Sequence, residues 1–214
     1  MSDFRLPPFY PILDTAALAA KAIGALDAAR AVLGEGAKII QYRHKAIWTQ
    51  EVFDEAAEIA RLCAEAGALL AVNDRVDYAK LLGTAVHLGG DDLSPFAARR
   101  VLGSDAVIGF STHNAFQVKR ASEEQVQYLA LGPIFSTTSK ANPDPVVGIE
   151  GLSKCRSLTT KPLVAIGGIT MEQAAAVLQA GADSIAVISG LLGGDSTLSS
   201  LRERTKAWVA ATRL

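Results

Sequence analysis

The chain alternates short runs of apolar and β-branched residues with longer, alanine-rich stretches, and it does so eight times in 214 residues. Continuous apolar runs between helical stretches are typical of parallel strands that are covered by helices. The predicted strands are Phe9–Leu13, Lys38–Tyr42, Leu69–Val72, Ala85–Leu88, Ala106–Phe110, Tyr128–Leu131, Leu163–Ile166 and Ile185–Ile188. The predicted helices include Ala16–Leu33, a helix from a Thr49 cap to Glu65, a short one ending at Leu82, one beginning at Ser94-Pro95, Ala115–Ser122, Ile149–Leu158, Met171–Ala180 and Leu198–Ala211.

Eight strand–helix units predict an α/β protein, a (β/α)8 TIM barrel, as a single domain spanning residues 1–214. An open, doubly wound sheet is the alternative. That fold favours a glycine-rich turn after the first strand, where this chain has Leu13-Asp14-Thr15. The long loop after the sixth strand, residues 132–147, is of a length that is usually functional or mobile.

Composition and net charge limit the kinds of molecule that this protein can be expected to bind. Half of the residues are hydrophobic, and the formal net charge is -1. That charge argues against nucleic acid or an anionic membrane as a partner, so any anion site must be local. Cys63 and Cys155 lie far apart without metal-ligand spacing, and we expect two buried, reduced thiols. With neither a signal-like segment nor a membrane-length apolar run, we expect a cytoplasmic protein.

Basic residues cluster where the second predicted strand ends. Gln41, Arg43 and Lys45 alternate along the chain, so they share one face of the strand and point together into the barrel mouth. Two cations and an amide that converge there indicate an anion, because arginine offers a two-pronged fork to phosphate oxygens. A solvated strand end with a surface ion pair is the alternative.

Carboxylates follow the next two strands. The third strand leads into Asn73-Asp74 and the fourth into Gly89-Gly90-Asp91-Asp92. Asp74 and Asp92 beside a basic cluster fit Mg²⁺, which is usually held by one or two carboxylates together with phosphate oxygens and water. Alternatively, these aspartates cap the helices that follow.

Hydroxyl groups follow the fifth and sixth strands. Ser111 can donate a hydrogen bond to an anion, while His113 or Asn114 can cap the next helix. The loop after the sixth strand carries a run of hydroxyls that ends in a lysine: Thr137, Thr138, Ser139 and Lys140. This run is consistent with a phosphate clamp, and a polar, flexible loop is the alternative.

Glycines and a serine follow the last two strands. Gly167-Gly168 and the pair Ile188-Ser189 lie where barrels often bind phosphate on backbone N–H groups. The chain therefore predicts two anion sites at its strand ends. The basic, carboxylate-rich one suits a magnesium diphosphate, and the neutral one suits a monophosphate.

With these motifs in hand, the chain resembles the thiamine-phosphate synthase family over nearly its whole length. The family's Q-x-R-x-K, N-D, H-x-G-Q-x-D, G-x-S, G-P-I-[FY]-x-T-x-T-K, I-G-G-I and V/I-S runs occur in order. They begin here at Gln41, Asn73, His87, Gly109, Gly132, Ile166 and Ile188. Each motif is weak alone, and their ordered combination at the strand ends is specific.

The resemblance implies a transferase of thiamine biosynthesis that joins 4-amino-2-methyl-5-(hydroxymethyl)pyrimidine diphosphate to a thiazole phosphate. It implies Mg²⁺ on Asp74 and Asp92, dissociative loss of diphosphate, and no protein nucleophile. The residues implied for the pyrimidine diphosphate are Gln41, Arg43, Lys45, Asn73, Ser111 and Lys140. Those implied for the thiazole phosphate are Thr137, Thr138, Ser139, Gly168, Ile188 and Ser189.

Arg43, Lys45, Ser111 and Lys140 are the residues expected to act in catalysis. Tyr42 and His44, inside the basic run, are also taken as substrate-binding, although strand alternation points His44 away from the mouth.

Two positions depart from the family pattern. Gly90 stands where the family usually has glutamine, which removes an amide beside the predicted metal site. Ser139 replaces a threonine and keeps the hydroxyl.

Three rival functions remain. A related thiazole tautomerase would use a histidine near the fifth strand, for which His113 is the candidate, but it tends to lack the full basic set. A phosphate-binding barrel isomerase or epimerase needs an acid–base pair or metal-binding histidines, a pattern that the three histidines do not form. A non-enzymatic ligand-binding barrel would show lost carboxylates or lysines. Homo-oligomerisation is left open.

Overall fold

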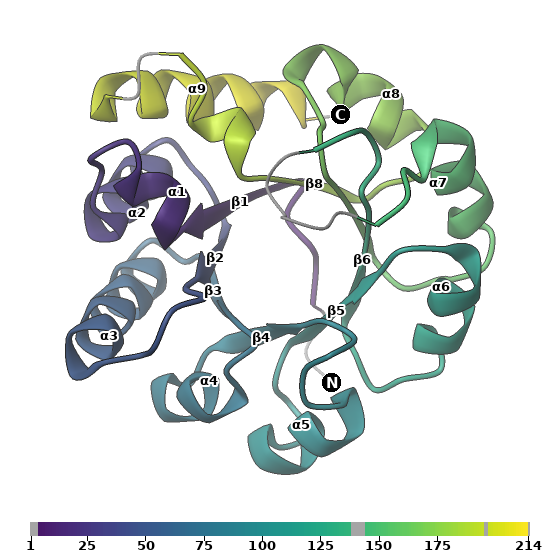
Figure 1. Ribbon diagram of the computed structural model, residues 1–214, viewed down its shortest axis with the longest axis horizontal. Helices are drawn as coiled ribbons and strands as arrows, with labels where there is room; N and C mark the ends of the chain where they lie inside the picture. The colour runs from purple at the N-terminus through teal and green to yellow at the C-terminus, as the bar shows by residue number, and fades with distance from the viewer. Residues whose placement is uncertain (1–3, 138–143, 195–196, 214) are drawn as a thin grey trace.

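A computed structural model of the chain describes residues 4–137, 144–194 and 197–213. Eight parallel strands close into a barrel in sequence order, with β8 paired to β1, and helices surround it (Figure 1). The strands are β1 Phe9–Asp14, β2 Ile39–Arg43, β3 Leu69–Asn73, β4 Ala85–Leu88, β5 Ile108–Thr112, β6 Tyr128–Leu131, β7 Leu163–Ile166 and β8 Ser184–Val187. The predicted (β/α)8 barrel is confirmed.

The helices fall between the strands, as predicted. They are α1 Thr15–Ala19, α2 Ala25–Gly34, α3 Gln50–Glu65, α4 Val76–Leu82, α5 Pro95–Leu102, α6 Ala115–Ala121, α7 Gly148–Arg156, α8 Ala174–Gln179 and α9 Leu198–Ala211, with 3₁₀ turns η1 Met171–Gln173 and η2 Ser189–Leu191. The predicted caps are confirmed: Thr49 accepts from the Val52 N–H, and Ser94 caps α5 with Pro95 in its first turn. In the part of the chain that the structure describes, no helix is long and apolar enough to cross a membrane.

The predicted helix Ala16–Leu33 is wrong as one element. The chain leaves α1 after Ala19, passes through Ala22 with a φ of 54°, and starts α2 after Gly24. Buried Ile23 occupies this break, so packing against the core overrides the helix propensity of the alanines.

The fifth strand lies two residues later than predicted, at Ile108–Thr112. Its register against β6 pairs Ser111 with Ala130 and Thr112 with Leu131. Thr112 can lie in a fully buried strand because its hydroxyl donates to the Ala130 carbonyl at 2.8 Å. This shift makes Ser111 part of the barrel wall.

Strand alternation divides the core into two parts. One lies between the barrel and its helices. The other fills the barrel interior with Tyr10, Ile12, Ile39, Ala71, Ala85, Tyr128, Ala130, Val164 and Ala186. Phe4 and Leu6 pack against this interior cluster from the N-terminal segment. Apolar and aromatic residues therefore fill the barrel interior next to this segment, and the charged residues that face inward lie at the C-terminal strand ends.

Both cysteines are buried free thiols, as expected. Burial raises the pKa of the Cys63 thiol to about 12 and also raises that of Cys155. Neither thiol therefore has thiolate character at neutral pH.

Candidate active site

A cavity of about 570 Å³ opens at the C-terminal strand ends, and all eight strands contribute to its wall. Most of the residues selected from the sequence line it: Gln41, Arg43, Lys45, Asn73, Asp74, Asp92, Ser111, Thr137, Gly168, Ile188 and Ser189. The structure thus brings the two predicted anion sites into one chamber. Thr138, Ser139 and Lys140 lie outside the described residues.

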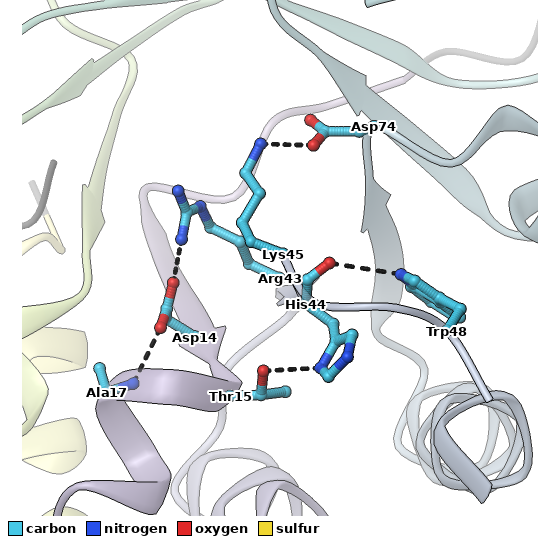
Figure 2. A network of polar contacts seen from close by, with 8 residues as sticks. All are labelled: Asp14, Thr15, Ala17, Arg43, His44, Lys45, Trp48 and Asp74. Atoms are coloured by element: carbon cyan, nitrogen blue, oxygen red, sulfur yellow. Dashed lines mark hydrogen bonds and ion pairs between the residues drawn. The ribbon is translucent and has the colours of Figure 1, made fainter. Parts of the chain in front are cut away.

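Tyr42 and His44 do not belong to this site, which corrects their assignment as substrate-binding residues. The Tyr42 side chain lies outside the barrel, and its hydroxyl donates to Glu55 on α3 at 2.7 Å. The His44 Nδ1 lies 2.8 Å from the Thr15 hydroxyl, on the far side of the chain from Lys45 (Figure 2). The cause is the strand alternation that turns Gln41, Arg43 and Lys45 inward.

Arg43 is held by Asp14, a residue that the sequence reasoning did not select for the site. Its guanidinium forms an ion pair with one oxygen of the buried Asp14 carboxylate. The other carboxylate oxygen accepts from the Ala17 N–H at 2.9 Å and caps α1 (Figure 2). Asp14 is the last residue of β1, but only the pairing of Asp14 with Arg43 in the barrel register reveals the contact.

Lys45 and Asp74 form an ion pair across the mouth of β2 and β3 (Figure 2). Asp74 has a φ of 64°, and its backbone N–H donates to the His87 carbonyl at 2.8 Å. The left-handed conformation is uncommon for a residue other than glycine and is often found at functional positions. It directs the carboxylate into the cavity.

Asp92 lies beside Asp74. Its Oδ2 accepts from the Gly89 N–H at 2.7 Å, which closes the loop after β4. Burial raises the pKa of the Asp92 carboxyl, and the neighbouring Asp74 adds to the rise, while the Gly89 N–H and Lys45 oppose it. Two adjacent carboxylates without a cation between them repel each other.

The capping alternative for these aspartates is wrong. Arg75 and Ser94 hold the N-cap positions of α4 and α5. Both aspartates line the cavity instead.

The second predicted anion site lies at the loops after β7 and β8. Gly168 has a φ of 66°, and a Cβ at this position would lie 2.3 Å from the Ser136 carbonyl oxygen. The Phe135 N–H donates to the Gly167 carbonyl at 2.9 Å, so the loops after β6 and β7 are in direct contact. Glycine is required here because the backbone is both left-handed and tightly packed.

Polar residues also form a chain deeper in the barrel, which sequence reasoning missed. Ser111 Oγ lies 2.9 Å from His87 Nε2, and His87 Nδ1 lies 3.1 Å from the Tyr128 hydroxyl. The Tyr128 and Tyr10 hydroxyls are 2.8 Å apart, and Gln41 Nε2 donates to Tyr10 at 3.2 Å. The sequence offers a single indication of this series: each of the five residues falls at a position of its strand that faces the barrel interior.

Asn73 presents an unsatisfied group to the cavity. The residue is buried, and its side-chain oxygen has no hydrogen-bonding partner within the described part of the chain. A buried acceptor of this kind is costly unless something donates to it.

His113 lies at the rim, with its Nδ1 2.6 Å from the Gly132 carbonyl oxygen and 3.4 Å from Asp144 Oδ2. Asn114, the other candidate, is the cap of α6 and accepts from the Gln117 N–H. His113 is thus tied to the loop after β6.

Comparisons with known proteins identify the family to which this barrel belongs. The family model described as thiamine monophosphate synthase matches residues 9–191. The chain belongs to this family. It is a transferase of thiamine biosynthesis, a thiamine-phosphate synthase by class.

Individual relatives agree with the family model. A thiamine-phosphate synthase of Koribacter versatilis is 45% identical over 89% of this chain and 92% of its own length. One of Chloroflexus aurantiacus is 40% identical over 86% of this chain and 84% of its own. The solved thiamine phosphate pyrophosphorylase of Pyrococcus furiosus superposes with a TM-score of 0.84 and 30% identity, covering 96% of this chain and 95% of its own.

Proposed function

We propose that this chain condenses 4-amino-2-methyl-5-(hydroxymethyl)pyrimidine diphosphate with a thiazole phosphate, giving thiamine phosphate and diphosphate with the help of Mg²⁺. One observation carries the proposal: Asp74 and Asp92 lie side by side within reach of Lys45, in the cavity that also contains Arg43. Carboxylates that lie beside cations suit a magnesium diphosphate.

The carboxylate pair fits the metal on its own chemistry. The raised pKa of Asp92 records the cost of burying one carboxylate beside Asp74. Asp74 and Asp92 would hold a divalent cation, which would offset that cost, and Lys45, which pairs with Asp74 here, would then be available to the diphosphate. Bound Mg²⁺ would neutralise charge on the departing diphosphate.

The protein's own cations act on the same leaving group. Arg43, fixed by Asp14, offers its guanidinium to the diphosphate, and Ser111 adds a hydroxyl from the wall. Lys140 is the further cation assigned to this group from the sequence. Loss of diphosphate leaves a pyrimidine methylene cation, so the protein has to stabilise the departing charge and align the acceptor, without a nucleophile of its own.

The two rings are assigned to different residues of the cavity wall. Gln41 and Asn73 are assigned to the pyrimidine, and its amino group would donate to the unsatisfied Asn73 oxygen. The thiazole phosphate is assigned to Thr137, Gly168, Ile188 and Ser189, which line the cavity. Thr138 and Ser139 are assigned to the same phosphate from the sequence. The thiazole nitrogen then captures the pyrimidine methylene carbon.

Support for a cytoplasmic location comes from the two buried, free cysteines, because disulfides are rare in reducing compartments.

The decisive experiment supplies purified protein with Mg²⁺ and both substrates and measures thiamine phosphate by mass spectrometry. We expect product that requires all three additions and that is lost in Asp74→Asn. Absence of product from the wild-type protein would refute the proposal. Conversion of a thiazole tautomer without the pyrimidine substrate, lost in His113→Gln, would favour the tautomerase instead.

A further inference from the structure

Five polar side chains from five different strands form a continuous hydrogen-bonded chain through the barrel interior. It runs from Gln41 on β2 through Tyr10, Tyr128 and His87 to Ser111 on β5, with links of 3.2, 2.8, 3.1 and 2.9 Å. Gln41 and Ser111 line the substrate cavity, together with Tyr10 and His87. The three residues between them have no assigned role in the reaction.

The surrounding residues pack closely around these hydrogen-bonded side chains. Both tyrosines are fully buried, and the His87 ring stacks on Tyr128 with centroids 5.6 Å apart. A Cβ at Gly109 would lie 2.0 Å from the Tyr128 Cζ. The absence of a side chain at Gly109, the glycine of the G-x-S run, therefore leaves room for the Tyr128 ring. Buried tyrosines keep their protons here, because burial raises the pKa of Tyr10 to about 12 and that of Tyr128 well above its usual value.

The direction of the hydrogen bonds follows from the first donor. The Gln41 amide donates to Tyr10, so the Tyr10 proton goes to the Tyr128 hydroxyl, since the described contacts give Tyr10 no other acceptor. Tyr128 then donates to His87 Nδ1. A neutral imidazole that accepts at Nδ1 carries its proton on Nε2, which donates to Ser111.

This direction fixes the hydrogen-bonding roles of Ser111 and Gln41, the two end members of the hydrogen-bonded series. Ser111 accepts from His87 and is left with its own proton to donate into the cavity. Gln41 uses its amide nitrogen on Tyr10 and is left with its oxygen as an acceptor. A chain that ran in the opposite direction would turn the Ser111 lone pairs toward an anion, which is unfavourable.

We propose that His87, Tyr128 and Tyr10 are positioning residues that hold Ser111 as a hydrogen-bond donor to the leaving diphosphate and Gln41 as an acceptor from the pyrimidine. The proposal rests on the function proposed above for its choice of ligands. The direction of the chain itself is a property of the substrate-free protein and can be measured without turnover.

The first test is the tautomer of His87. In protein labelled with ¹⁵N-histidine, the nitrogen shifts separate pyrrole-type from pyridine-type nitrogens, and comparison with His87→Gln assigns the signals among the three histidines. We expect a neutral ring with its proton on Nε2. A proton on Nδ1, or a doubly protonated ring at neutral pH, overturns the proposal whether or not the enzyme is active.

The second test separates donation from packing. Glutamine at position 87 can place an amide N–H near Nε2, whereas leucine only fills space. We expect His87→Leu to lower kcat about tenfold, with the KM for the thiazole phosphate unchanged, and His87→Gln to recover most of that loss. Equal turnover in the two variants contradicts the assigned role.

The third test breaks the chain one link away. Tyr128→Phe removes the donor to His87 Nδ1, and we expect the His87 tautomer to become mixed and kcat to fall about tenfold. Should this variant not fold, Tyr10→Phe removes the preceding donor with a smaller expected effect. Tyr42→Phe is the matched control, because it removes a buried tyrosine hydroxyl outside the barrel and should leave the tautomer unchanged. An unchanged tautomer and an unchanged rate in the folded chain variants refute the proposal.

Discussion

Asp14 and Arg43 form an ion pair in which the carboxylate serves two partners at once, the guanidinium and the Ala17 N–H at the start of α1. The pairing of β1 with β2 sets Asp14 opposite Arg43 in register. One residue thus ties the first helix of the barrel to the cation that we assign to the diphosphate.

The double role of Asp14 can be separated by two substitutions. Asp14→Asn keeps an N-cap acceptor but removes the charge that holds Arg43, so we expect a normal Tm with a KM for the pyrimidine diphosphate raised about threefold to tenfold. Asp14→Ala removes both interactions, and we expect an additional stability loss of about 1 kcal/mol. Calorimetry and steady-state kinetics on both variants check this. An unchanged KM in Asp14→Asn would show that Arg43 needs no such support.

The Asp92 carboxyl gives a pH-dependent stability. Its pKa is raised above the ordinary value of 3.8 by burial and by Asp74. A carboxyl whose pKa is higher in the folded protein than in the unfolded chain favours folding when protonated, and this contribution is lost as the pH rises through the folded value. Without Mg²⁺, we therefore expect Asp92→Asn to raise the Tm at neutral pH by about 1–2 °C and to leave it unchanged below pH 3.8.

Mg²⁺ should reverse that ranking. The cation relieves the repulsion between Asp92 and Asp74, so the wild-type Tm should rise with added MgCl₂ and that of Asp92→Asn should not. Scanning calorimetry with and without EDTA measures both effects. A Mg²⁺ response that survives in Asp92→Asn would place the metal elsewhere.

Much of the site could be predicted from the sequence because it depends on alternation along single strands. The bounds of β4, β6 and β7 agree with prediction. Gln41, Arg43 and Lys45 share the cavity face, as their spacing requires. The assignment of Tyr42 and His44 to the site is wrong because it treats the whole run as one unit, whereas alternation turns every second side chain outward.

The rest depends on contacts between strands, which no local pattern contains. The pairing of Asp14 with Arg43 requires the β1–β2 register, and the meeting of Tyr10 with Tyr128 requires closure of the barrel. The break at Ala22 escaped prediction for a related reason: burial of Ile23, a tertiary effect, outweighs local helix propensity.

Gly168 should tolerate no side chain. Gly168→Ala adds a Cβ 2.3 Å from the Ser136 carbonyl oxygen at a φ of 66°, and both effects are unfavourable. We expect a stability loss of about 1–3 kcal/mol and a raised KM for the thiazole phosphate, because the loops after β6 and β7 must separate. Gly193→Ala is the control, since its Cβ meets no atom within 4 Å and its φ is not left-handed. Urea denaturation of the two variants should differ clearly, and equal midpoints would argue against the packing role.

Gly90 is the position where this chain departs from the family glutamine. The structure allows the effect of restoring glutamine there to be predicted. A Cβ at Gly90 meets no atom within 4 Å, whereas a Cβ at Gly89 would lie 3.3 Å from the Asp92 Oδ2. We therefore expect Gly90→Gln to fold with an unchanged Tm and to return an amide to the cavity wall, lowering the KM for the pyrimidine diphosphate about twofold to fivefold. Gly89→Ala should instead disturb the Asp92 loop and weaken the dependence of turnover on Mg²⁺. A Gly90→Gln protein with poorer kinetics than wild type would mean that this loop is adapted to glycine and leaves no room for an amide.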